Sequence, residues 1–309
     1  MEVVCLGSSH RDTLWACCSA LDCEPPDGDH FGGKVNEAVQ PLPTSYFGDG
    51  DEDASVRGLE IALGEPGIQL VSVTCGRGDE SYKPDGPLQE VARSAGLPLL
   101  NLRDVRREVG AADFVISFYN RVIFPAGYIE EVRWGVLNIH PAPLPEYRGC
   151  RTVEHALLNG AAEFGATLHF CDGGLDTGPI VDEERIPITS LDTARTLCSK
   201  ADALALLMLR RTLPRVVKAA RDGRRVAARA QDATRAHYFG ASLPREARLE
   251  LSGGWESLVR QVRAYDHPQW EPAFVECDGH RICFRSKDGQ IVIDQVHALG
   301  KASQDSLAR

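Results

Sequence analysis

Short apolar runs that alternate with helical segments constrain the fold of this chain more than any other feature of its sequence. Residues 68–74, 113–118 and 135–139 are short and rich in β-branched or aromatic side chains, as expected of buried strands. Residues 87–95 carry apolar side chains at helical spacing, with Gly96 as the expected C-cap. Strands that alternate with helices build βαβ units, so the pattern predicts an α/β protein with a mainly parallel, doubly wound sheet.

The two ends of the chain depart from this alternation. Residues 22–53 are rich in proline, glycine and acidic side chains, so we expect an inserted loop with a solvated acidic run at 49–53. Short alternating runs near the C-terminus, with turns at Asp278-Gly279 and Asp288-Gly289, predict a small β-rich domain. The expected organisation is a main domain, this β-rich C-terminal domain and a frayed tail, over residues 1–228, 229–300 and 301–309.

A long helical pattern covers residues 191–220. Pro214 lies inside it and predicts a break or a kink. Seven basic residues follow on its polar side between positions 210 and 225, which we interpret as a solvated face, with a binding site for substrate phosphates as the alternative. The expected buried stripe consists of Leu197, Leu204, Leu207, Met208 and Val216.

Composition argues against several classes of protein. No apolar run reaches the roughly 18–20 residues that span a bilayer, and the N-terminus lacks the basic start of a signal peptide, so we expect a cytoplasmic protein without a membrane partner. The ten cysteines are scattered, without a C-x-x-C pair or a zinc spacing, which indicates reduced thiols and no metal site. A formal net charge of -10 argues against nucleic acid, whose binding proteins usually carry a basic surplus.

The chemically informative stretch begins at the end of one expected strand. Asn138 and His140 are two residues apart, so both side chains should project to the same face of the sheet. Pro141 cannot donate to a strand ladder, and the strand should therefore stop there. This pair is thus expected at a carboxyl edge, where open α/β sheets place their ligands.

A second polar segment, residues 172–178, follows the expected strand at 165–170 and combines two aspartates with three glycines. Asp176 in this segment could reach a histidine on a neighbouring strand. An Asn, a His and an Asp that converge on one edge suit acyl transfer, because the amide and imidazole can stabilise an oxyanion while the carboxylate orients the imidazole or accepts a proton. No Ser or Cys has a nucleophile-elbow context, so a covalent acyl-enzyme is not indicated.

Both segments resemble one family. NIHPAPLPEYRG at residues 138–149 and GATLHFCDGGLDTG at residues 165–178 closely resemble the motifs of formyltransferases that use 10-formyltetrahydrofolate. The likeness is best over residues 68–190, and it implies a Rossmann-like folate domain with a smaller C-terminal domain. The catalytic Asn-x-His pair and later Asp of the family match Asn138, His140 and Asp176.

Finer details are similar to the sugar N-formyltransferases of that family. These are the runs FYNR at 118–121, TLH at 167–169 and HYFG at 237–240, whereas ASLPREARLEL at 241–251 departs from the usual pattern. The resemblance implies that the pterin of the folate lies along the loop after Phe118 and against the loop at 171–176. Tyr147 and Arg148 are expected to bind the acceptor, and the expected folate contacts are Tyr119, Asn120, Arg121, Ile123, Cys171, Asp172 and Gly173.

The resemblance implies an N-formyltransferase. It would move a formyl group from 10-formyltetrahydrofolate, as co-substrate, to the amine of a small molecule such as an aminosugar or a natural-product intermediate. Two alternatives use the same residues: formylation of methionyl-tRNA, disfavoured by the net charge of -10, and hydrolysis of formyltetrahydrofolate. A catalytically dead binding protein and a homodimer remain open.

Overall fold

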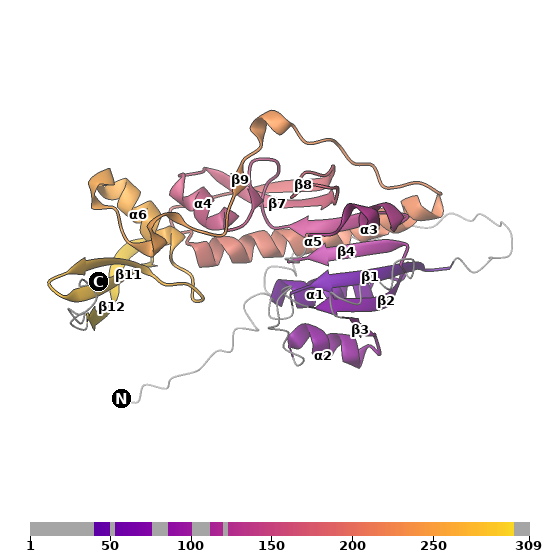
Figure 1. Ribbon diagram of the computed structural model, residues 1–309, viewed down its shortest axis with the longest axis horizontal. Helices are drawn as coiled ribbons and strands as arrows, with labels where there is room; N and C mark the ends of the chain where they lie inside the picture. The colour runs from indigo at the N-terminus through magenta and orange to yellow at the C-terminus, as the bar shows by residue number, and fades with distance from the viewer. Residues whose placement is uncertain (1–39, 50–52, 76–85, 101–111, 120–122, 300–309) are drawn as a thin grey trace, which may run out of the picture. The chain divides into compact units, whose positions relative to one another are not determined.

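The computed structural model describes residues 40–49, 53–75, 86–100, 112–119 and 123–299 (Figure 1). Within these ranges, seven strands form one sheet in the order β3-β2-β1-β4-β5-β7-β8. Their bounds are β1 Leu42–Gly48, β2 Ile68–Cys75, β3 Leu99–Leu100, β4 Phe114–Phe118, β5 Val136–His140, β7 Glu163–Phe170 and β8 Ile180–Pro187.

Strand direction divides this sheet into two parts. Strands β3, β2, β1, β4 and β5 pair in parallel, as the alternating sequence pattern predicts. Strand β7 runs antiparallel to both of its neighbours, β5 and β8. The mainly parallel α/β sheet is therefore confirmed, with one reversed strand beside the strand that carries Asn138 and His140.

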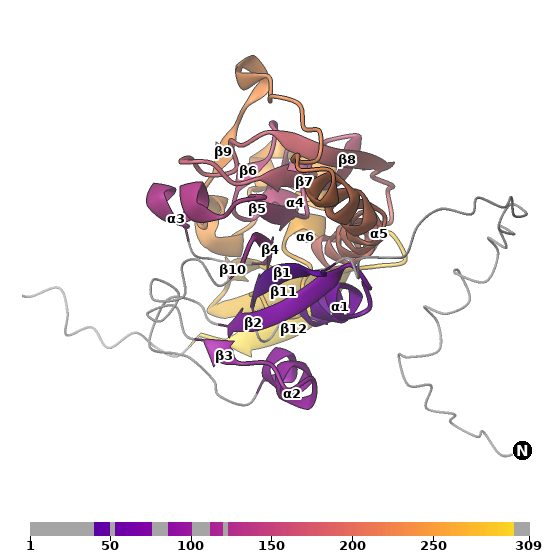
Figure 2. The same ribbon diagram turned by 90° about the vertical axis from the view of Figure 1, so that its right-hand side faces the viewer.

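Helices cover both faces of the sheet (Figure 2). Tyr46 and Ile116 belong to the core that includes side chains of α1 and α5. Their strand neighbours Phe47 and Val115 point the other way and belong to the core beside α3. The helices of this region are α1 Asp53–Leu63, α2 Pro87–Ser94, α3 Ala126–Glu131, α4 Thr152–Leu158 and α5 Ala194–Arg221.

Helix α5 runs for 28 residues without interruption. It starts at a capping box, in which Thr193 and Thr196 exchange side-chain and backbone hydrogen bonds. Pro214 lies inside the helix, so of the predicted break or kink the break does not occur. The predicted buried stripe is correct except at Leu207, which is exposed because it lies on the outer face of the helix.

The C-terminal part contains a separate antiparallel sheet, which confirms the small β-rich region. Its described strands, in the order β10-β11-β12, are Ala273–Cys277, His280–Lys287 and Gln290–Ala298. Helix α6, Gly254–Ala264, contributes Val262 to a core that also contains Phe274 and Cys283. Between α5 and α6 lie short 3-10 helices at Ala233–Arg235, Pro244–Ala247 and Leu251–Gly253.

Residues 229–239, here called the strap, connect α5 to the C-terminal part and run past β8 and β7 toward β9 (Figure 1). The strap begins with a backbone bridge between Arg229 and Ile180 at the start of β8. It ends as strand β9, Tyr238–Phe239, which pairs in parallel with the short strand β6, Arg148–Gly149. These first residues of the predicted C-terminal domain thus contact the elements that carry the candidate site.

The predicted insertion at residues 22–53 is wrong over residues 42–48, which form the buried strand β1. The sequence LPTSYFG contains proline and hydroxyl side chains, which lower its apparent strand character. These hydroxyls are satisfied internally, because Ser45 hydrogen bonds to Ser72 across the strand pair and Thr44 donates to the carbonyl of Leu42. The acidic run is not wholly solvated either, since Asp49 is buried.

Tyr46→Ala is expected to lower the free energy of unfolding by about 3–5 kcal/mol, because it empties a fully buried aromatic site in a central strand. It also removes the hydroxyl that donates to the carbonyl of Ser55 at 2.7 Å. Urea unfolding would measure the change, with Leu63→Ala at an exposed helix position as the matched control. Equal, small effects of both substitutions would contradict a core strand at residues 42–48.

Among the described residues, no helix combines the length and the apolar character that crossing a lipid bilayer would require.

Candidate active site

Asn138 and His140 lie on one face of β5, as their spacing predicts. In the antiparallel register, Asn138 lies opposite His169 of β7. The amide nitrogen Nδ2 of Asn138 is 3.1 Å from Nε2 of His169, and the rings of His140 and His169 have centroids 6.4 Å apart. His169 therefore lies close to both predicted catalytic side chains.

A directed chain of hydrogen bonds fixes the amide of Asn138. Nδ1 of His169 is 2.9 Å from the carbonyl of Phe170, which can only accept, so in a neutral ring Nε2 is the acceptor. Asn138 must then turn Nδ2 toward His169 and Oδ1 toward the hydroxyl of Ser117, which donates at 2.9 Å. The second N–H of Asn138 has no acceptor within the described part of the chain, and it is available to a substrate oxygen.

The orientation of the His140 ring is set by the proline-rich loop that follows β5. Its Nε2 is 2.7 Å from the carbonyl oxygen of Tyr147, so this nitrogen carries the hydrogen. In the neutral ring, Nδ1 is then the nitrogen that holds a lone pair. The imidazole is largely buried, and a proton acceptor is thus held rigidly beside Asn138.

Asp176 reaches the same place by a route that the sequence does not predict. Because β7 is antiparallel to β5, its last residue, Phe170, pairs with Leu137 near the start of β5. The loop that follows β7 therefore begins at the opposite end of β5 from His140. The loop then folds back, and the N–H of Phe170 donates to the carbonyl of Pro179. The approach is close enough that a Cβ at Gly178 would lie 1.8 Å from the oxygen of Phe170. Glycine is therefore required there.

The carboxylate of Asp176 lies against two groups of the site. Oδ2 accepts a hydrogen bond of 2.8 Å from the N–H of Gly149, and Oδ1 lies 3.6 Å from Nε2 of His169. Its backbone has φ of 52°, in the left-handed region that most side chains avoid. Asp and Asn tolerate this region best, but the conformation still requires support from neighbouring groups.

The electrostatic surroundings keep Asp176 ionised. Burial by itself would raise its pKa. The positive charge that His140 carries when protonated, the hydrogen bond and charge of a protonated His169, and the N–H of Gly149 together hold the pKa far below its usual range. A carboxylate with so low a pKa is a poor proton acceptor near neutral pH. The structure therefore favours orientation and charge stabilisation by Asp176 over proton abstraction.

Two of the expected folate contacts in the loop after β4 can be described. Tyr119 has φ of 54°, and its ring stacks on Phe118 at 5.2 Å while its hydroxyl donates to Asp202 of α5. The ring and the hydroxyl of Tyr119 thus both contact other residues of the protein. Ile123 is 70% exposed, and Asn120 and Arg121 lie outside the described residues.

The expected folate contacts at 171–173 organise the first half of the Asp176 loop. Asp172 accepts hydrogen bonds from the N–H of Gly174, at 2.9 Å, and from the hydroxyl of Thr177. The N–H of Cys171 donates to the carbonyl of Val136, and burial raises the pKa of its thiol to about 12. Gly173 has no heavy atom within 4 Å of an added Cβ, so its backbone faces open space.

Both expected acceptor contacts make interactions within the chain. The ring of Tyr147 stacks on Phe239 of the strap, with centroids 5.4 Å apart. The guanidinium of Arg148 is buried and donates to Oε1 of Gln231, at 3.1 and 2.7 Å, and to the hydroxyl of Tyr238, at 2.6 Å. No carboxylate pairs with Arg148 among the described residues.

Sequence reasoning did not assign Ser117, His169 or Gln231 to the site. Ser117 and Gln231 carry no local signal, because their partners lie 21 or more positions away in the chain. His169 belongs to the Thr-Leu-His run, and only the antiparallel register of β7 places it opposite Asn138.

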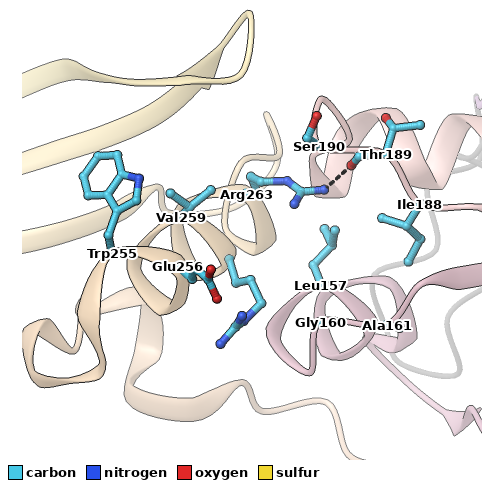
Figure 3. Close-up of a pocket in the computed structure, with 11 residues that line it drawn as sticks. Leu157, Gly160, Ala161, Ile188, Thr189, Ser190, Trp255, Glu256, Val259 and Arg263 are labelled. Carbon is cyan, nitrogen blue, oxygen red and sulfur yellow. Dashed lines mark hydrogen bonds between the residues drawn. The ribbon is translucent and has the colours of Figure 1, made fainter.

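A different cavity, of about 400 Å³, lies between α4, residues 188–190 and α6 (Figure 3). Arg263 spans one side of it and donates to the carbonyl of Thr189 at 2.6 Å. None of Asn138, His140 and Asp176 lines this cavity. It is therefore distinct from the candidate active site.

Comparison with known proteins identifies relatives of this chain. Residues 90–213 match the sequence model of the family described as formyl transferase. A GDP-perosamine N-formyltransferase from Brucella melitensis is 28% identical over 241 residues, which cover 73% of this chain and 90% of that protein. A methionyl-tRNA formyltransferase from Sorangium cellulosum is 32% identical, over 68% of this chain and 69% of the relative.

A solved structure shares the fold. It is the N-formyltransferase from Helicobacter canadensis in complex with folinic acid and dTDP-3-aminofucose, with a TM-score of 0.63 and 19% identity, over 84% of this chain and 100% of that one. Family membership is established by the methionyl-tRNA formyltransferase, because the identity of 32% extends over 68% of this chain. The chain therefore belongs to the formyl transferase family, whose members move a one-carbon formyl group.

Proposed function

We propose that this enzyme transfers the formyl group of 10-formyltetrahydrofolate to the amine of a small molecule, with an aminosugar as the favoured acceptor. The observation that carries the proposal is the convergence of Asn138, His140 and Asp176 around His169 at one edge of the sheet. A free amide N–H, a rigid proton acceptor and a fixed negative charge are the groups that formyl transfer to an amine requires.

Asn138, His140 and Asp176 each have a separate role in the proposed reaction. The neutral amine of the acceptor attacks the formyl carbon, and the second N–H of Asn138 stabilises the negative charge that develops on the formyl oxygen. Nδ1 of His140 takes the proton that the attacking nitrogen loses, while Asp176 stabilises the resulting imidazolium. The bond between the formyl carbon and the folate nitrogen then breaks, and this nitrogen receives the proton from His140.

Pterin recognition is assigned to the loops that follow β4 and β7. Tyr119 follows β4 and residues 171–173 follow β7, and both strands pair with β5, which carries Asn138. The side chain of Tyr119 is engaged with Asp202, which favours recognition by backbone groups at this position. The Helicobacter canadensis relative, whose structure contains folinic acid, supports a folate donor.

A small-molecule acceptor is favoured over tRNA by the pairing of the basic residues on α5. Arg211 forms ion pairs with Asp182 and Glu184 of β8, and Arg215 pairs with Asp182. These arginines are therefore partly neutralised, and the chain as a whole has a net charge of -10. A tRNA-binding surface needs basic side chains that are available to phosphates.

The proposal is tested by incubating the full chain with 10-formyltetrahydrofolate and a panel of amines, while tetrahydrofolate absorbance and formylated product are followed. We expect turnover with nucleotide-linked aminosugars and little with unrelated amines. Formate release without an amine would establish the hydrolase alternative, and turnover only with methionyl-tRNA would establish the tRNA enzyme. Absence of tetrahydrofolate formation under every condition would contradict formyl transfer.

A further inference from the structure

Gln231 of the strap occupies a junction between two parts of the candidate site. Its amide nitrogen donates to the carbonyl oxygens of Asp176 and Gly178, at 2.9 and 2.7 Å. Its amide oxygen accepts two hydrogen bonds from the buried guanidinium of Arg148. Both N–H groups and the oxygen of this side chain are thus used, and the amide has one orientation only, because a flip would place N–H groups against a cation.

These contacts act on the backbone of the proposed catalytic aspartate. Asp176 is in the left-handed region, where a non-glycine residue persists only if its surroundings hold it. Asp172 organises the first half of the loop, whereas Gln231 holds carbonyls on both sides of Thr177. The direction of the Asp176 carboxylate toward His169 and Gly149 therefore depends on an amide from a segment 55 positions away.

We infer that Gln231 is a positioning residue for formyl transfer, and that its two N–H groups hold Asp176 in its productive conformation. This inference rests on the proposed function, because it assigns Gln231 a role through Asp176. Gln231 does not touch the reacting atoms. It couples the strap to the catalytic loop, because its amide nitrogen binds the carbonyls of Asp176 and Gly178 from the strap. Its amide oxygen accepts from Arg148, which also donates to the hydroxyl of Tyr238 in β9.

Gln231→Glu separates this role from a general structural one. Glutamate keeps the size of the side chain and an acceptor for Arg148, so the fold is maintained. It lacks the N–H donors, however, and places a carboxylate against the carbonyls of Asp176 and Gly178. We expect kcat to fall roughly 10²-fold through misplacement of Asp176, while KM for either substrate changes much less. Gln231→Met, which removes both functions, should lower kcat at least as much.

Arg229→Gln is the matched control. Arg229 lies on the same strap and its exposed side chain pairs with Glu183, but it does not contact the Asp176 loop through that side chain. We expect kcat to remain at the wild-type level in this variant. Thermal unfolding of the variants would establish that each is folded at the assay temperature.

The outcomes distinguish a failure of the positioning role from a failure of the proposed function. Wild-type activity and its loss in Asp176→Asn must first establish formyl transfer and the role of the aspartate; failure at this step counts against the proposed function. If both hold and Gln231→Glu turns over like the wild type, the positioning role is wrong. An equal loss of kcat in Arg229→Gln would also overturn it, because any loosening of the strap would then suffice.

Discussion

Asn138→Ala is expected to lower kcat by about 10²–10³-fold, the range found when a single donor to an oxyanion is removed. The physical reason is the free N–H that remains after Nδ2 binds His169 and Oδ1 accepts from Ser117. KM for the folate should change little if this N–H acts on the developing charge rather than on the bound ground state. Steady-state kinetics with a verified amine would measure both constants.

Ser117→Ala is the companion variant for this prediction. It retains the amide of Asn138 but removes the hydroxyl that orients Oδ1, so we expect a loss smaller than that of Asn138→Ala. The hydroxyl is buried, and its removal leaves Oδ1 without this donor, which explains why some loss remains. Full turnover by Asn138→Ala would show that the oxyanion is stabilised elsewhere.

Asp176→Asn is expected to lower kcat by about 10²–10⁴-fold, because the imidazolium of His140 would lose the negative charge that stabilises it. Asparagine preserves the shape of the side chain, tolerates the left-handed backbone and can still accept from the N–H of Gly149. The loss would therefore report charge rather than geometry. Wild-type kcat in this variant would exclude an electrostatic role for Asp176.

The same substitution has a pH signature in stability. The folded-state pKa of Asp176 is depressed relative to its ordinary value of 3.8. A carboxylate of this kind stabilises the fold above its unfolded pKa, and the contribution is lost as the pH falls toward the folded value. The difference in unfolding free energy between wild type and Asp176→Asn should thus be larger at pH 5 than at pH 3. Constancy across this interval would contradict the charge-based account.

The sequence predicts the strands that consist of buried apolar side chains. It does not predict a buried strand whose polar side chains find their hydrogen-bond partners inside the protein. The run at 114–118 is buried at every position, so its apolar character is visible without knowledge of its neighbours. Strand β1 is equally central, but its serine and threonine hydroxyls find partners only once the sheet has formed. Residue composition alone therefore makes this strand look like part of a loop.

The candidate site shows a similar division. The two-residue spacing of Asn138 and His140 is a local property of a strand, and their common face could be predicted from it. The direction of β7 leaves no trace in hydrophobic periodicity, so neither the place of His169 nor the return of the Asp176 loop could be predicted. Gln231 was invisible for the same reason, because its partners come from two other segments.

The parallel pairing of β9 with β6 affects how this enzyme can be recombined with its relatives. Tyr238 and Phe239 pair with Arg148 and Gly149, so the chain that leads into the C-terminal half first forms a strand pair with the catalytic half. A chimera joined near residue 228 would bring a foreign strap into the reaction centre. Grafts that aim to change the acceptor should therefore be spliced beyond Gly240, so that the catalytic half keeps its own strap.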